Sequence, residues 1–202
     1  MAERPGMSSD SDQKLSDLVA RMRDPNPAVW SKAADGLCRM GTAAIPVMIE
    51  LLTSADENIR GYMAWALGKF GSAADSAVPA LLKLLTDQGA THFQGKRRAY
   101  PVRFRAAFAI ANIDPGRQEI IPLLREAMNY CKVDYIQSEA HETIRKLGPH
   151  ASVFLPELKA VEHAPKPLDR VRIQMTLAAL DPTYEITDET AKLVAKTVGR
   201  MS

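Results

Sequence analysis

The sequence is poor in cysteine and has no long apolar run and no large excess of one charge. Its two cysteines, Cys38 and Cys131, lie far apart in segments with helical patterning, so we expect neither a disulfide framework nor a zinc cluster. No apolar run reaches the roughly 18 residues of a membrane-spanning helix. The 26 Lys and Arg residues nearly balance the 24 Asp and Glu residues, and the net charge of +2 does not by itself indicate nucleic acid or a membrane as the partner.

Two further absences concern the N-terminus and catalysis. Residues 1–14 are polar and lack the apolar core of a secretory signal, so we expect a disordered lead-in and a soluble, cytoplasmic protein. The sequence has no Gly-rich phosphate loop and no G-x-S-x-G motif. It therefore predicts no catalytic residue, no metal site and no cofactor, and it favours a binding protein over an enzyme.

The dominant feature is an internal repeat with helical spacing. Four segments open on an aliphatic residue and place apolar residues 4, 8 and 11 positions later, which lie on one side of an α-helix. The residue at position 7 is usually small, which allows close helix packing. A fifth, weaker copy opens at Asp169. The apolar columns are Val29/Ala33/Leu37/Met40, Ile59/Met63/Leu67/Phe70, Val102/Ala106/Ile110/Ile113, Ile136/Ala140/Ile144/Leu147 and, in the fifth copy, Ile173/Leu177/Leu180.

Each repeat carries signals for the end of one helix and the start of another. Twelve positions after the opening stands a residue that ends the helix, and in three copies it is a glycine suited to the left-handed C′ position. The second helix has a proline near its start, where proline removes no needed hydrogen bond. The stop residues are Gly41, Gly71, Asp114 and Gly148, and the prolines are Pro46, Pro79, Pro122 and Pro156.

Helix pairs at this spacing predict a solenoid. The openings are 30, 43, 34 and 33 residues apart, and a pair of that length buries its apolar side only by stacking on its neighbours. We therefore expect an all-α protein, an α-solenoid (armadillo-like superhelix) of about five helical hairpins over residues 15–202. An amphipathic helix at about 187–199, with Asp188 as its N-cap, is expected to cap the array.

This pattern resembles the HEAT-repeat family, most closely its short bacterial form, which is similar to phycobilisome (bilin) lyases. The resemblance rests on Asp24-Pro25-Asn26-Pro27, on Asn58-Ile59-Arg60 and on the A-x-x-A-[LI]-x-x-[ILMF]-G runs of the repeats. It covers roughly residues 15–183 and implies HEAT-type hairpins. It leaves the function open, because repeats of this kind serve many unrelated partners.

The repeats differ most between the second and third copies, where residues 86–101 add roughly ten residues and are expected to form a flexible loop. From Thr86 to Arg105 the local charge is +4, whereas the whole chain carries only +2. Arginine beside aromatic side chains suits an acidic peptide, phosphate groups or single-stranded nucleic acid. A solvated surface loop would have the same composition. The candidate binding residues are Lys96, Arg97, Arg98, Tyr100, Arg103 and Arg105.

Aromatic residues beside the apolar columns are a second set of candidates. Trp65 and Phe108 occupy the same repeat position, and Trp30 stands where the family often has arginine. Such residues either line a groove that anchors a partner or pack at the edge of the core. We include Trp65 and Phe108 among the partner-binding candidates and keep core packing as the alternative.

The pair His141-Glu142 resembles the metal motif of deoxyhypusine hydroxylase, another HEAT protein. That family combines several such pairs, whereas the corresponding positions of the other repeats here have no histidine. We therefore expect no metal site, with His141 packed between repeats and Glu142 on the surface.

Three functions remain open from the sequence. The first is a non-catalytic scaffold or adaptor that binds an acidic or phosphorylated protein through the solenoid surface and the basic segment 86–105. The second, which the resemblance alone implies, is a bilin-lyase-like or chromophore-chaperone role. The third is nucleic-acid binding through the same segment, which the low overall charge makes the weaker alternative.

Overall fold

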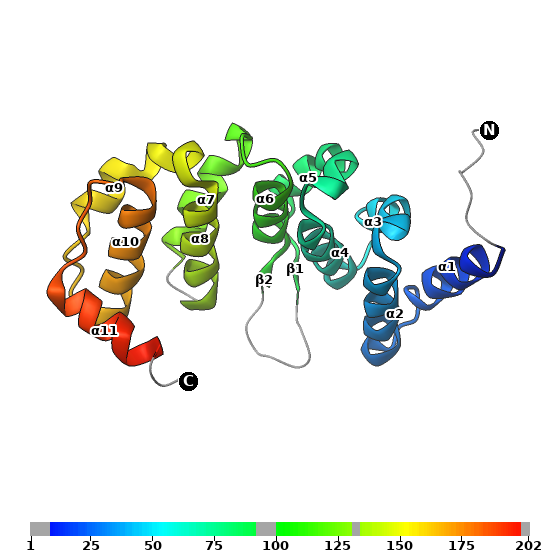
Figure 1. The fold of residues 1–202 in the computed structure, drawn as a ribbon. Coiled ribbons are helices and arrows are strands. Elements are labelled where there is room, and N and C mark those ends of the chain that lie inside the picture. Colours follow the sequence, from blue (N-terminus) through cyan, green and yellow to red (C-terminus); the bar gives the residue numbers. More distant parts are fainter. Residues whose placement is uncertain (1–8, 92–99, 131–133, 199–202) are drawn as a thin grey trace. The chain divides into compact units, whose positions relative to one another are not determined.

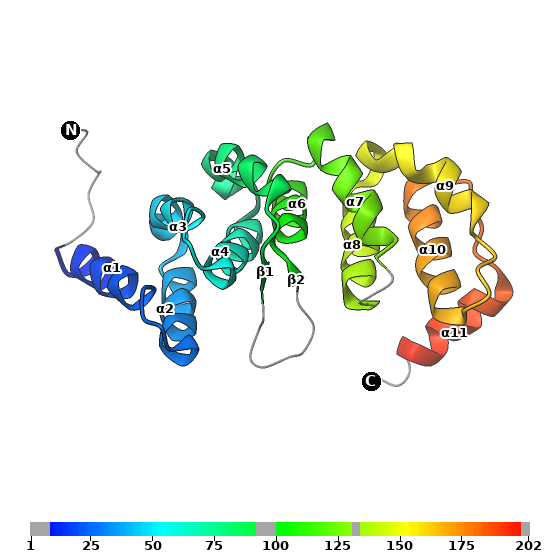
Figure 2. The ribbon, with the colours of Figure 1, turned by 180° about the vertical axis from the view of Figure 1, so that it is seen from behind.

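The computed structural model describes residues 9–91, 100–130 and 134–198, whose regular elements are helices and one short pair of strands (Figures 1 and 2). Within these ranges, five hairpins follow one another from α2/α3 to α10/α11, so the predicted all-α solenoid is confirmed. No helix in the same ranges is both long and apolar enough to cross a membrane. The helices are α1 (Ser9–Arg21), α2 (Pro27–Arg39), α3 (Ile45–Leu51), α4 (Glu57–Lys69), α5 (Val78–Lys83), α6 (Val102–Ile113), α7 (Ile121–Met128), α8 (Asp134–Leu147), α9 (Leu155–Ala160), α10 (Pro167–Leu180) and α11 (Asp188–Val198).

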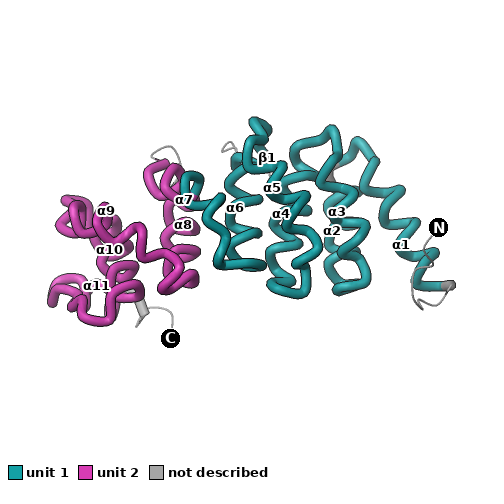
Figure 3. Tube along the Cα trace, turned by 90° about the horizontal axis from the view of Figure 1, so that it is seen from above, with its two compact units in different colours: residues 1–123 teal, residues 124–202 magenta. Residues whose placement is uncertain are grey.

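The chain divides into two compact units, residues 1–123 and residues 124–202 (Figure 3). In the first unit, α2, α4 and α6 lie in one layer, and α3 and α5 form a second layer (Figures 1 and 2). The predicted apolar columns supply its core, in which Met63, Leu67 and Ile110 are fully buried. A Cβ added to Gly68 of α4 would lie 2.8 Å from the Cα of Ala109 in α6. The close contact of these two helices therefore requires a glycine.

Helix α1 begins earlier than the sequence suggests. Residues 9–14 are helical, although they belong to the predicted disordered lead-in 1–14, and residues 1–8 lie outside the described part of the chain. Leu15 of α1 and Met22, which follows the helix, are buried, and α1 packs against the neighbouring helix α2. Asp10 and Asp12 stand in the first turn, where negative charge is favourable beside the positive end of the helix dipole. The polar composition here marks the start of a helix.

Three of the four predicted helix stops have the expected geometry. Gly41, Gly71 and Gly148 have positive φ angles of 68°, 53° and 53°. Asp114 has a φ of −137°, so the third copy ends without a left-handed residue. Its helix stops because Pro115 follows, and the residue before a proline disfavours the α conformation. The predicted prolines all lie in the first turn of a second helix, namely Pro46 in α3, Pro79 in α5, Pro122 in α7 and Pro156 in α9.

The sequence suggested that the whole inserted segment is a loop, but parts of it have regular structure. Its ends pair as two antiparallel strands, β1 (Ala90–Thr91) and β2 (Tyr100–Pro101), with Ala90 opposite Pro101. The N–H of Val102 then donates to the carbonyl oxygen of Gly89 at 3.0 Å. The strand pair brings the two ends of the insertion together, so α4 and α6 remain neighbours in spite of the extra residues.

In the second unit, α10 packs against α8, α9 and α11. Gln174 of α10 is fully buried, donates to the carbonyl oxygen of Glu162 at 3.2 Å and accepts from the N–H and hydroxyl of Thr187 at 3.2 and 3.0 Å. The carbonyl of Thr187 accepts the first helical bond of α11, from Ala191 at 2.9 Å. Thr187 therefore occupies the N-cap position that the sequence assigned to Asp188.

Candidate partner-binding surface

An arginine of α4 fixes the base of the insertion. Arg60 donates from Nε to Oδ2 of Asp87 at 2.7 Å and from Nη2 to Oδ1 at 3.1 Å. Its Nη1 donates to the carbonyl oxygens of Ser54 and Ala55 at 2.8 and 3.0 Å. Asp87 also accepts from the N–H of Gly89 at 2.7 Å. One side chain thus joins the turn before α4 to the start of the inserted segment.

These hydrogen bonds keep Asp87 ionised. Burial opposes its charge, because the side chain is only 8% exposed, but the bonds from Arg60 and Gly89 outweigh that cost and lower its pKa below the usual range. A Cβ on Gly89 would lie 2.8 Å from Nη2 of Arg60, so the arrangement leaves no room for a larger residue. The one carboxylate of segment 86–105 is therefore bound to Arg60 from outside the segment.

Two of the candidate residues are buried. Tyr100 is 3% and Phe108 4% exposed, and their rings pack edge to face with centroids 6.4 Å apart. The guanidinium of Arg105 lies 3.7 Å from the ring centroid of Tyr100, and that of Arg103 lies 4.8 Å from Phe104. Such stacking restricts an arginine side chain. The buried rings position cations, and direct contact of Tyr100 and Phe108 with a partner stays a prediction.

The structure describes two of the five basic candidates. Arg103 and Arg105 are half-buried at the start of α6, whereas Lys96, Arg97 and Arg98 lie outside the described residues. Helix α6 begins without a side-chain cap and without an acidic residue in its first turn. A helix N-terminus carries partial positive charge, and the two arginines increase the positive charge at this end of α6.

Trp65 is the candidate aromatic residue with an exposed part. It is half-buried on α4, whereas Trp30 is only 6% exposed. The ring of Tyr62 stands between them, with centroids 6.1 Å from Trp30 and 5.3 Å from Trp65. Burial and a hydrogen bond from its hydroxyl to Asp35 raise the pKa of Tyr62. The ammonium of Lys69 lies 5.2 Å from the Trp65 ring, so this tryptophan has a cation beside it.

His141 and Glu142 lie as predicted. His141 is 5% exposed, and its Nδ1 lies 3.1 Å from Oγ1 of Thr176 on the neighbouring helix α10. Glu142 is on the surface and pairs with Lys146 at 2.7 Å. The packing of His141 between repeats is therefore confirmed. Across the described ranges, the structure groups no three His, Cys, Asp or Glu side chains that would hold a metal ion.

Sequence reasoning missed the residues that hold the candidates in place. Arg60 is recognisable as the arginine that follows the opening aliphatic residue, but its partner Asp87 is 27 residues away and no helical spacing links the two. Tyr62, which supports Trp65, lies outside the apolar columns and carries no local signal of its role.

Comparison with known proteins agrees with this architecture. The family model for HEAT repeats matches residues 15–91. Phycocyanobilin lyase subunit alpha from Thermosynechococcus vestitus is 32% identical over 99 residues, which are 46% of this chain and 34% of that protein. The chain thus spans about a third of the length of this relative. A crystal structure of an engineered protein matches this chain with a TM-score of 0.51 and 21% sequence identity. The match covers 82% of this chain and 78% of the engineered chain, and it shows likeness of fold alone. The predicted resemblance to HEAT repeats is confirmed over residues 15–91, which match the family model.

Proposed function

We propose that this chain is a non-catalytic interaction module that binds an acidic or phosphorylated protein through segment 86–105 and the adjoining helical surface near Trp65. HEAT repeats support the general role of an interaction scaffold. The observation that carries the specific proposal is the ion pair of Asp87 with Arg60. The only carboxylate of the segment is paired with Arg60 of α4, and the segment has no second carboxylate to offset its five cations.

The start of α6 supports the same conclusion. Arg103 and Arg105 stand where the helix dipole favours acidic residues, and they stack on Phe104 and Tyr100. A local arrangement that costs stability is typical of a functional site. An acidic or phosphorylated side chain would be attracted by both arginines and by the helix N-terminus.

The test is an affinity pull-down from native lysate, with bound proteins identified by mass spectrometry. Wild type is compared with a triple variant in which Lys96, Arg97 and Arg98 are each replaced by alanine. The control variant replaces three exposed lysines elsewhere in the first unit, Lys14, Lys32 and Lys83, and so removes the same charge. We expect wild type and control to hold the same partner and the triple variant to lose it, with weaker binding at high salt.

Two outcomes would contradict the proposal. If the triple variant remains folded and retains the partner, segment 86–105 is not the binding surface. If nuclease treatment releases the partner, the segment binds nucleic acid, and the salt dependence of binding should then be steep.

A second function is favoured by one observation, the 32% identity to phycocyanobilin lyase subunit alpha. On that ground the chain would bind a bilin and assist its attachment or transfer. The test is to mix the purified protein with phycocyanobilin and record the absorbance spectrum. A spectrum equal to that of the free pigment at saturating protein would remove this alternative.

A further inference from the structure

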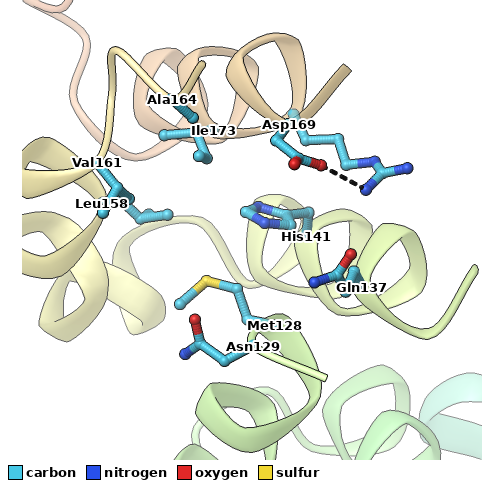
Figure 4. Close-up of a pocket in the computed structure, with 10 residues that line it drawn as sticks. Met128, Asn129, Gln137, His141, Leu158, Val161, Ala164, Asp169 and Ile173 are labelled. Atoms are coloured by element: carbon cyan, nitrogen blue, oxygen red, sulfur yellow. Dashed lines mark hydrogen bonds and ion pairs between the residues drawn. The ribbon is translucent and has the colours of Figure 1, made fainter. Parts of the chain in front are cut away.

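The second unit contains a pocket of about 200 Å³ between α8, α9, α10 and the end of α7 (Figure 4). Its walls are mainly apolar: Leu158 and Ile173 are buried, and Val161, which is 50% exposed, stands where the pocket meets solvent. Figure 4 shows the ring of His141 in the middle of this pocket, between Asp169 and Met128. An apolar pocket with a small number of fixed polar groups is the usual form of a small-molecule site.

The proton of the His141 ring is placed by its neighbours. The hydroxyl of Thr176 donates to the carbonyl oxygen of Arg172 at 2.7 Å, so its single proton is used. Its oxygen therefore accepts both from Nδ1–H of His141 at 3.1 Å and from Nη1 of Arg145 at 3.4 Å. With the proton on Nδ1, Nε2 presents a lone pair. Among the described residues, Nε2 has no hydrogen-bond partner.

The pocket carries no net charge. Burial, with the positive charges of Arg145 and Arg172, lowers the pKa of His141 to about 4, so the ring is neutral at pH 7. Arg172 pairs with Asp169, whose Oδ1 lies 3.3 Å from its Nη1. A charged ligand would have to separate this pair or lose its own hydration without compensation, so the pocket selects against ions.

We propose that this pocket binds a small, uncharged aromatic molecule, the size of one substituted ring, whose hydroxyl or N–H group donates a hydrogen bond to Nε2 of His141. The size follows from the volume, because an apolar cavity of about 150 Å³ is enough to hold benzene. The donor follows from the tautomer, because a ligand with only acceptors would leave Nε2 unpaired. This inference is independent of the binding role proposed for segment 86–105.

The experiment uses the full chain with ¹⁵N-labelled histidine and p-cresol as the probe. Before addition, we expect the NMR spectrum of His141 to show a neutral ring protonated at Nδ1. On titration the Nε2 resonance should shift with a dissociation constant on the order of 1 mM. The matched probe is 4-methylanisole, which has the same ring without the donor and should bind at least about fivefold more weakly.

Two variants separate the acceptor from the cavity. H141F keeps a ring but removes the lone pair and should weaken p-cresol binding about fivefold, whereas H150F, at an exposed histidine of the same unit, should leave it unchanged. N-acetyl-tyrosine amide is titrated in parallel. If p-cresol binds and N-acetyl-tyrosine amide does not, the ligand is a free small molecule. If the two bind equally, the pocket accepts an aromatic ring that a tyrosine of a peptide also supplies.

Three results would overturn the proposal: a proton on Nε2, no shift of the Nε2 resonance by either phenol, or equal binding of p-cresol and 4-methylanisole. All three are measured on the wild-type protein, so they stand even if H141F does not fold.

Discussion

The two units of the chain are held together in different ways. Among the described residues, every polar residue that is buried as a whole and every large apolar residue that is strongly exposed lies in the second unit, whereas the first unit buries the side chain of Asp87 against Arg60. The first unit contains the close Gly68–Ala109 contact, and both units have fully buried apolar side chains, such as Met63 in the first and Phe154 in the second. The buried polar residues are His141, Thr143, Gln174, Thr176 and Thr190, and the exposed apolar ones are Tyr135, Val153, Val161, Leu168, Met175 and Ile186.

This difference illustrates two contributions to the stability of a helical repeat, close packing and buried hydrogen bonds between helices. Close packing depends on volume and is insensitive to pH. A buried hydrogen-bond network depends on protonation and on each donor finding its acceptor. The match to HEAT repeats, over residues 15–91, falls within the first unit. The match thus includes the close helix contact at Gly68, whereas the buried polar network around His141 and Gln174 and the pocket lined by His141 lie outside it.

The largest effect is expected from truncating the core of the first unit. Phe104 of α6 is fully buried, so F104A should cost about 3–5 kcal/mol in the free energy of unfolding. The loss should appear as faster amide hydrogen exchange in peptides from α4 and α6. F70A is the control, because Phe70 is half-buried at the end of α4 and should cost clearly less. Equal costs for the two variants would contradict a core centred on the α4–α6 contact.

Acid should weaken the second unit selectively. The pKa of His141 is lowered from 6.5 to about 4 by burial and by Arg145 and Arg172. Between these two pH values, His141 is therefore protonated in the unfolded chain and neutral in the folded chain. Stability should therefore be complete above about pH 6.5 and fall as the pH drops toward 4, by about 3 kcal/mol in total.

Hydrogen exchange at several pH values measures this loss in α8 and α10. H141F should remove most of the acid sensitivity, because its ring takes up no proton, and H150N should keep it. The interpretation is wrong if α2 and α4 lose protection as steeply as α8 and α10.

Breaking one buried polar contact should have a smaller effect. Q174L leaves the carbonyl of Glu162 and the N–H of Thr187 without their partner and should cost about 2 kcal/mol, with faster exchange at the start of α11. Q118L is the matched control. Gln118 is exposed, and its only bond shown is to the carbonyl of Gly116 at 3.3 Å, so the change should stay within about 0.5 kcal/mol. If both variants are neutral, the buried network does not stabilise the second unit.

The sequence predicts the helices of both units but not the contacts that distinguish them. Periodicity, stop glycines and first-turn prolines act within a dozen residues, so they are readable from the chain alone. The pairs Arg60–Asp87 and His141–Thr176 join residues 27 and 35 apart; the first holds the start of the insertion against α4, and the second joins helices of neighbouring repeats.

Trp65 and Phe108 show the same limit within one repeat position. Both stand six residues after the opening of their helix, yet Trp65 is half-buried and Phe108 is 4% exposed. The difference comes from Tyr100 of the inserted segment, which covers Phe108. The exposure of a repeat position therefore depends on what the insertion packs against, which periodicity does not encode.

The smallest effect, and the most direct test of packing by shape, comes from adding one methyl group to a glycine. In G68A the new Cβ would lie 2.8 Å from the backbone of Ala109, which cannot move without separating α4 from α6. Overpacking costs about 1–3 kcal/mol and the gain in helix propensity returns about 1, so we expect a net loss of about 1 kcal/mol.

The matched variant is G36A, in which the new Cβ meets only the tip of Leu18, at 2.6 Å. A flexible side chain can rotate away, so the helix propensity gain should dominate and the variant should be neutral or up to about 1 kcal/mol more stable. Chemical denaturation of both variants measures the sign of the change in the free energy of unfolding for each. Opposite signs support a first unit in which backbone contact between α4 and α6 sets the spacing of the repeats. The same sign in both would mean that the helices shift easily, and the contrast with the second unit would then be one of hydrogen bonding alone.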